Sequence, residues 1–251
     1  MNNQSYIELE KVKKKIEESL ARYGEYSNEL IELYEEAADI YCSLEEYELC
    51  KEYLLKVLNI KKHFYGDNNI ALIKTYNQLT TVAETIEEIV FYLNEVIKIK
   101  TLIYGVPHLE TANTYAELAN AYAYVEENEK AVYYYELALN IYITNEDNYL
   151  EIIGCYNEIA SIKWMMDDTD KAIELEKKAL EYSIKYLGEN HMDTGNYYCS
   201  VGIMYDETDC YEEALIYLQK GLDILEKILE PTDENLIFVK EQVQKTKEKL
   251  K

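Results

Sequence analysis

Apolar residues recur at intervals of three and four along most of the chain, and polar residues fill the positions between them. Between residues 105 and 142 this pattern predicts two amphipathic helices, separated by a polar break at residues 126–128. Small residues at Ala119, Ala131 and Ala138 would let the two helices pack closely. Neither helix could bury its apolar face alone, so the pair requires neighbours of the same kind.

The same arrangement returns along the chain with a nearly constant period. The aromatic positions Tyr115, Tyr156 and Tyr198 are separated by 41 and 42 residues. The small positions in the second helix of each pair keep the same spacing and are Ala131, Ala172 and Ala214. We expect these alanines to lie at helix crossings. Helix–turn–helix units repeated at this period predict an all-α fold, an α-solenoid of antiparallel helix pairs.

Five such units fit between two single helices. We expect an N-terminal capping helix over residues 1–22, repeats over residues 23–229 and a C-terminal capping helix over residues 230–251, with Thr232 as its cap. The approximate repeat ranges are 23–64, 65–103, 104–144, 145–186 and 187–229. The second repeat is short in the turn between its helices. We interpret this as a tolerated turn deletion, and a local change of superhelical pitch is the alternative.

Composition narrows the possible partners and location. With 8 Gly and 2 Pro, the chain has little of the turn chemistry that sheets need. Its formal charge of −24 would repel nucleic acids and anionic membranes, so we expect neither as a partner. No apolar run approaches the ~18 residues of a membrane span. The first residues are too polar for a secretory signal. The five cysteines form no CxxC pair, so we expect reduced thiols in a cytoplasmic protein.

Catalytic motifs are missing from the sequence. No serine has a histidine and an acid arranged by a motif, and no segment carries the glycines and lysine of a phosphate-binding loop. The three histidines are too far apart in sequence to suggest a metal site. Paired carboxylates such as Glu45-Glu46 fall at predicted turns, where a solvated surface is the favoured interpretation. We therefore predict no enzymatic activity, no cofactor and no metal.

The repeats resemble the tetratricopeptide repeat, which places an aromatic residue, Leu-Gly, Tyr, Ala, a second aromatic residue and Ala at fixed offsets. The third unit matches with Tyr115, Leu118, Ala119, Tyr122, Ala131, Tyr135 and Ala138, and the fifth with Tyr198, Val201, Gly202, Tyr205, Ala214, Leu218 and Gly221. The period exceeds the usual 34 residues of this repeat. The extra residues contain Gly-x-x-His at His108 and His191, which is similar to the lengthened repeats of kinesin light chains. The resemblance implies a right-handed superhelix, with both histidines at helix starts.

In tetratricopeptide proteins the first helix of each repeat lines a concave groove that binds a partner. The resemblance assigns that role to Glu32, Glu35, Asp39, Lys74, Asn77, Asn113, Asn120, Asn157, Ser161, Trp164, Asn196 and Ile203. The groove is expected to be acidic at its N-terminal end, rich in Asn in the middle and more apolar near Trp164. Asn amides can hold a peptide backbone at both N–H and C=O, although Asn is also common throughout this chain. Trp164 is either a binding anchor or a core residue.

We therefore predict a non-catalytic protein–protein interaction module that binds a peptide or helical segment of a partner protein. Kinesin light chains have a basic groove that takes acidic peptides, whereas the matching surface here is acidic. The expected partner accordingly carries basic and apolar residues. Two alternatives stay open, a structural subunit of a homo- or hetero-oligomer and an intracellular receptor for a small signalling peptide.

Overall fold

The computed structural model describes residues 2–105 and 107–251. Met1 belongs to the predicted N-terminal cap and Val106 to the predicted third repeat, and both lie outside the described residues. Within the described ranges the chain forms twelve α-helices and two short 3-10 helices, and no strand. The predicted all-α fold of antiparallel helix pairs is therefore confirmed.

The helices group into two compact units, Met1–Val125 and Glu126–Lys251. The first unit contains α1 (Asn2–Tyr23), α2 (Asn28–Ser43), α3 (Tyr47–Tyr65), the 3-10 helix η1 (Ile70–Leu72), α4 (Ile73–Thr81), α5 (Ile86–Tyr104) and α6 (Leu109–Tyr124). The second contains α7 (Asn128–Tyr142), η2 (Glu146–Asn148), α8 (Tyr149–Met165), α9 (Thr169–Tyr186), α10 (Met192–Glu207), α11 (Tyr211–Leu225) and α12 (Glu234–Lys249).

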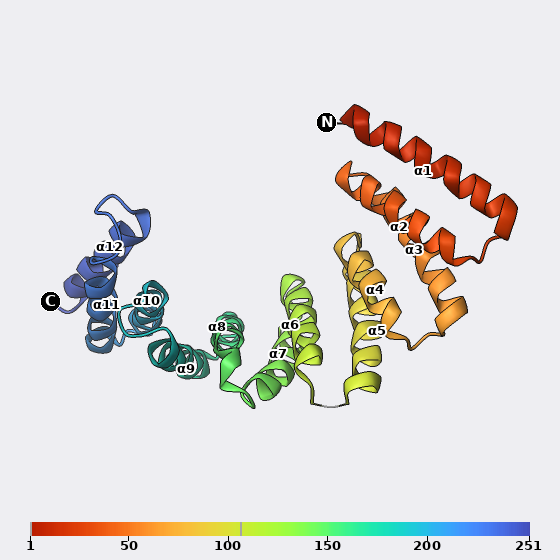
Figure 1. Cartoon of the computed structure of the whole chain (residues 1–251). Coiled ribbons are helices and arrows are strands. Elements are labelled where there is room, and N and C mark those ends of the chain that lie inside the picture. The colour runs from red at the N-terminus through yellow and green to blue at the C-terminus, as the bar shows by residue number, and fades with distance from the viewer. Residues whose placement is uncertain (1, 106) are drawn as a thin grey trace. The chain divides into compact units, whose positions relative to one another are not determined.

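Within each unit, consecutive helices pack side by side (Figure 1). The most extensive contacts are those within the hairpins α2–α3 in the first unit and α8–α9 and α10–α11 in the second. Ala131, Ala172 and Ala214 each have 0% of their surface exposed, so the alanines singled out by the repeat register do lie in the core. None of the described helices is long and apolar enough to cross a membrane.

The turns inside the hairpins share an unusual backbone conformation. Glu45, Glu126, Asp167 and Asp209 adopt the left-handed region, with φ between 59° and 62°. Each follows the first helix of its repeat and reverses the chain into the second. The second repeat turns differently, because α4 ends at Thr81 and the Thr85 hydroxyl accepts a hydrogen bond from the Glu88 backbone N–H to start α5. Its shorter turn needs no left-handed residue.

Helix starts follow the sequence prediction at two places and depart from it at a third. The Nδ1 atoms of His108 and His191 accept hydrogen bonds from backbone N–H groups at the starts of α6 and α10, both at 3.2 Å, which confirms their predicted role. The predicted cap Thr232 is wrong. Asp233 caps α12 instead, since its carboxylate accepts from the backbone N–H of Asn235 at 2.9 Å. A carboxylate here also stabilises the positive end of the helix dipole.

The expectation of five reduced thiols is corrected. Cys42 near the end of α2 and Cys50 near the start of α3 form a disulfide across the hairpin turn, with Cα atoms 5.5 Å apart. No sequence motif indicates this bond, because the two cysteines are brought together only by the reversal of the chain. Cys155 and Cys199 are free and buried, and burial raises the pKa of both thiols to about 12. The cytoplasmic location was predicted from reduced thiols, and disulfides are uncommon in reducing compartments. The location therefore stays a prediction.

Candidate peptide-binding groove

In the first unit, predicted groove residues of α2 and α4 lie on a common face. Glu35 of α2 pairs with Lys74 of α4, with an N–O distance of 3.9 Å. One turn further along, the Asp39 carboxylate accepts a hydrogen bond from Gln78 of α4 at 3.4 Å. Both contacts join residues 39 positions apart, three fewer than the 42 that separate equivalent positions of these two helices, such as Tyr34 and Tyr76. The first helices of these two neighbouring repeats therefore contact each other through polar side chains.

The net negative charge on the α2 part of the groove is smaller than the number of its acidic residues suggests, because lysines pair with one of them. The half-buried Glu35 is held by the buried Lys61 of α3, whose Nζ lies 2.7 Å from its carboxylate, as well as by Lys74. Glu32 and Asp39 are exposed. The negative surface available to a partner is thus carried by Glu32 and Asp39, whereas Glu35 is part of the structure.

The asparagines of the first unit are exposed on α4 and α6. Asn77, Asn113 and Asn120 all have exposed side chains. Asn113 and Asn120 already interact with other groups of the chain. On the same helix, burial raises the pKa of the Glu117 carboxyl. This surface offers amide groups together with a carboxyl.

In the second unit, the predicted groove residues lie on α8 and α10. Asn157 is half-buried and Ser161 is exposed on α8. Trp164, in the last turn of α8, is also half-buried, and its neighbour Met165 has 63% of its surface exposed. Ile203 is partly buried against the core of the unit. Trp164 is thus neither fully buried nor fully exposed.

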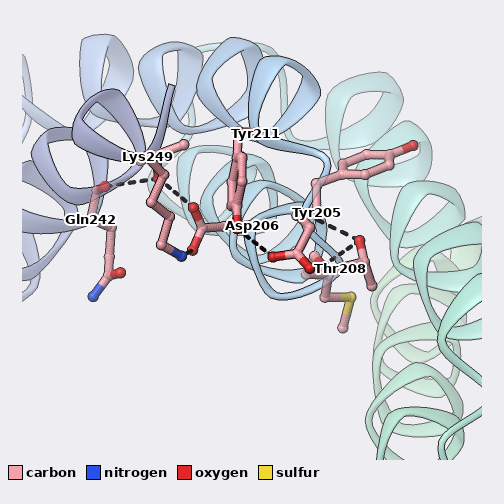
Figure 2. Close-up of polar contacts among 9 residues, drawn as sticks. Tyr205, Asp206, Thr208, Tyr211, Gln242 and Lys249 are labelled. Atoms are coloured by element: carbon pink, nitrogen blue, oxygen red, sulfur yellow. Dashed lines mark hydrogen bonds and ion pairs between the residues drawn. The ribbon is translucent and has the colours of Figure 1, made fainter. Parts of the chain in front are cut away.

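The C-terminal helix α12 occupies the position that a further first helix would take. Asn235 donates to the side-chain oxygen of Asn196 on α10 at 3.0 Å. Thr246 donates to Asp206 at 2.8 Å, and Lys249 of α12 pairs with the same carboxylate (Figure 2). These pairs are 39 to 43 residues apart, close to the repeat offset. The oxygen of Asn196 is therefore already used within the unit, and this lowers its capacity to hold a peptide.

A second repeated feature was not predicted from the sequence. A lysine of the second helix lies over the tyrosine 22 residues earlier on the first helix, with Nζ 5.5–5.9 Å from the ring centre. The pairs are Tyr34–Lys56, Tyr156–Lys178 and Tyr198–Lys220. Cavities of about 280 and 300 Å³ open beside the first and last of these pairs. The signal was present in the sequence as a Tyr–Lys spacing that recurs with the repeat.

Metal-binding clusters are not found in the described parts of the chain. No group of three or more His, Cys, Asp or Glu side chains is placed to hold a metal ion there. The groups that line the candidate groove are amides, carboxylates, the amine of Lys74, one hydroxyl and apolar surface. Such groups form hydrogen bonds, ion pairs and apolar contacts, which is the chemistry of recognition.

Comparison with known proteins agrees with this architecture. A family model described as tetratricopeptide repeat matches residues 152–227, which run from α8 to just beyond α11. No curated protein matches the chain. The resemblance to tetratricopeptide repeats is thus confirmed by sequence in the second unit.

Solved structures extend the likeness in fold to most of the chain. TPR-like repeats from Podospora anserina, described as those of a kinesin light chain, are 19% identical, with a TM-score of 0.64 over 80% of this chain and 98% of that chain. BtubC (BKLC) from P. vanneervenii is 15% identical, with a TM-score of 0.62 over 92% of this chain and 93% of that chain. The apo form of RapI is 17% identical, with a TM-score of 0.71 over 99% of this chain and 70% of that chain. At these identities the shared property is the repeat fold.

Proposed function

We propose that this chain is a non-catalytic protein–protein interaction module that binds an extended or helical segment of a partner on the first helices of its repeats. The observation that carries this proposal is the common face of α2 and α4, where the predicted groove residues Glu35 and Lys74 of neighbouring repeats pair with each other. A face built by repetition presents similar groups at regular steps, which suits an extended ligand. Tetratricopeptide folds in general serve as scaffolds for protein interactions.

The partner we propose carries basic and apolar residues. Exposed Glu32 and Asp39 attract Lys or Arg, and the net charge of −24 adds a negative field that speeds association. The half-buried Trp164 and the exposed Met165 offer apolar contact that salt does not screen. Each unit thus contributes its own kind of contact.

A displayed library of random 15-residue peptides, panned on the whole chain, tests the proposal. Selected peptides should be enriched in Lys or Arg and in a bulky apolar residue. For the best peptide, Glu32→Gln with Asp39→Asn should slow association and flatten its dependence on salt, while Trp164→Ala should mainly speed dissociation. Glu35 is left unchanged in this design, because its removal would leave the buried Lys61 unpaired.

Glu17→Gln with Glu18→Gln is the matched control, since both residues are exposed on α1 and outside the groove positions. It removes the same charge and should leave the binding rates nearly unchanged. Selection of acidic peptides, or equal effects of the groove and α1 variants, would contradict the proposal. Light scattering in the absence of peptide tests the competing oligomer model directly, because a structural subunit held through its ends or its convex face would form a stable oligomer without any peptide.

A further inference from the structure

One buried carboxyl in the second unit stands where the other repeats have a large apolar side chain. Glu176 of α9 lies between the small residues Ala172 and Ala179, and only 1% of its surface is exposed. The equivalent positions of the other four repeats are Leu54, Leu93, Tyr135 and Leu218, which are between 0% and 3% exposed. The repeat register therefore identifies Glu176 as a polar substitution in the core.

Few groups form hydrogen bonds or ion pairs with the Glu176 carboxyl. Its Oε2 atom is buried and has no hydrogen-bond partner among the described residues. Burial raises the pKa of Glu176 to about 7, and the opposing effect of the Ser200 hydroxyl on α10 is smaller. An unpaired charge is costly in such a site, so the neutral form is favoured.

Charged groups on the surrounding helices do not supply the missing partner. On α10, the charge of Glu176 acts on Tyr197, whose pKa burial raises to about 12, and Asp193 adds further negative charge. On α8, Glu158 also acts on Tyr197 and is again negative.

The neighbouring lysines of α9 itself serve other groups. Lys177 interacts with Tyr217 and Tyr205, and Lys178 pairs with Glu174 at 2.8 Å. The cations closest to Glu176 in sequence are therefore engaged elsewhere, and ionisation of its carboxyl adds one more negative charge to an acidic neighbourhood.

We propose that Glu176 is a pH-sensitive latch between α9 and α10, which holds α10–α12 firmly when its carboxyl is protonated and loosely when it is ionised. The helices α10, α11 and α12 pack on one another, and α10 packs on α9. In a repeat array each repeat is stabilised by its interface with the next one. A weaker α9–α10 interface therefore lowers the free energy that is needed to detach α10–α12. The latch does not depend on the proposed function.

The direction of the pH effect follows from the two pKa values. The pKa of Glu176 rises from an ordinary 4.5 to about 7 in the folded chain. The contribution of protonated Glu176 to the free energy of unfolding is fully present below pH 4.5 and is lost as the pH rises through 7. The unfolding equilibrium constant of this unit should therefore rise on the order of a hundredfold across that interval, at about tenfold per pKa unit.

Denaturant unfolding between pH 5 and 8.5 tests the latch on the whole chain. Trp164 is the only Trp and lies in α8, so its fluorescence reports on the second unit. Wild-type protein should lose stability as the pH rises toward 8. Glu176→Gln should remove this step, and Glu176→Leu, which copies Leu54 and Leu218, should remove it and raise the midpoint at pH 8. The control Glu181→Gln, an exposed residue of the same helix, should keep the step.

Amide hydrogen exchange, corrected for the intrinsic effect of pH, locates the change. Protection of α10–α12 should fall relative to α8 between pH 5.5 and 8 in wild type and stay constant in Glu176→Gln. Identical pH profiles of wild type and Glu176→Gln would overturn the proposal. So would a loss of stability in Glu176→Leu at every pH, since it would show that the carboxyl is a net stabiliser.

Discussion

The buried amine of Lys61 donates a hydrogen bond to the hydroxyl of Thr75 across the α3–α4 junction, with an N–O distance of 3.0 Å. One repeat later Lys100 makes the same bond to Thr114, also at 3.0 Å. Both lysines have 8% of their surface exposed. A long cationic side chain at the end of one repeat thus fixes the first helix of the next, and the first unit uses this link twice.

Removal of the amine should therefore destabilise the first unit. Lys61→Met keeps the stem but leaves Thr75 and Glu35 without this partner, at a cost of about 1–3 kcal/mol in the free energy of unfolding. Thr75→Val should recover part of that loss in the double variant, because the hydroxyl then no longer needs a donor. Urea unfolding followed by circular dichroism measures both. Lys98→Met, an exposed lysine of α5, should change stability by less than about 0.5 kcal/mol; an equal loss there would contradict a structural role for Lys61.

Overpacking at Ala172 should also be costly. Its side chain is fully buried in α9, and additional methylene groups would force its neighbours apart. Ala172→Leu should reduce the free energy of unfolding by about 1–3 kcal/mol, read from the Trp164 fluorescence midpoint. Ala21→Leu, on the exposed face of α1, is the control and should be nearly neutral. An unchanged midpoint for Ala172→Leu would mean that the crossing has spare room.

Sequence periodicity was sufficient to predict the fold, because the same apolar pattern recurs in each repeat. It could not predict contacts between side chains that lie far apart in the sequence. The compensation of Glu35 by Lys61 links residues 26 positions apart, and the pairing of Asp206 with Lys249 links residues 43 apart. Neither leaves a local mark on the apolar pattern. Glu176 was visible only as a mismatch, and its burial had to come from the packed structure.

The Cys42–Cys50 disulfide should be detectable by counting thiols. Under denaturing, non-reducing conditions an alkylating reagent should label three of the five cysteines, and all five after reduction. Peptide mapping by mass spectrometry should recover residues 42 and 50 in one linked species. Five labelled cysteines without reductant would show that the two residues are neighbours without a bond and would restore the prediction of reduced thiols. Reduction should lower the stability of the first unit, because the bond closes a short loop in the unfolded chain.

Two glycines in the second unit should respond in opposite ways to the same substitution. A Cβ added at Gly202 would lie 2.7 Å from Leu218 Cγ and 2.9 Å from the Leu218 backbone nitrogen, so α10 and α11 would have to separate. A Cβ at Gly154 in α8 would meet nothing within 4 Å. Gly154→Ala should therefore stabilise the unit by about 0.5–1 kcal/mol through helix propensity, whereas Gly202→Ala should destabilise it by about 1–3 kcal/mol.

Both variants can be compared by thermal unfolding under one set of conditions, with Trp164 fluorescence as the probe. The opposite signs matter more than the sizes, because both changes carry the same gain in helix propensity. The difference between them therefore isolates the steric cost at the α10–α11 crossing. If Gly202→Ala were as stable as Gly154→Ala, the two helices could not be as close as the repeat register places them. The occurrence of a small residue at position 202 would then not be explained by close packing of α10 and α11.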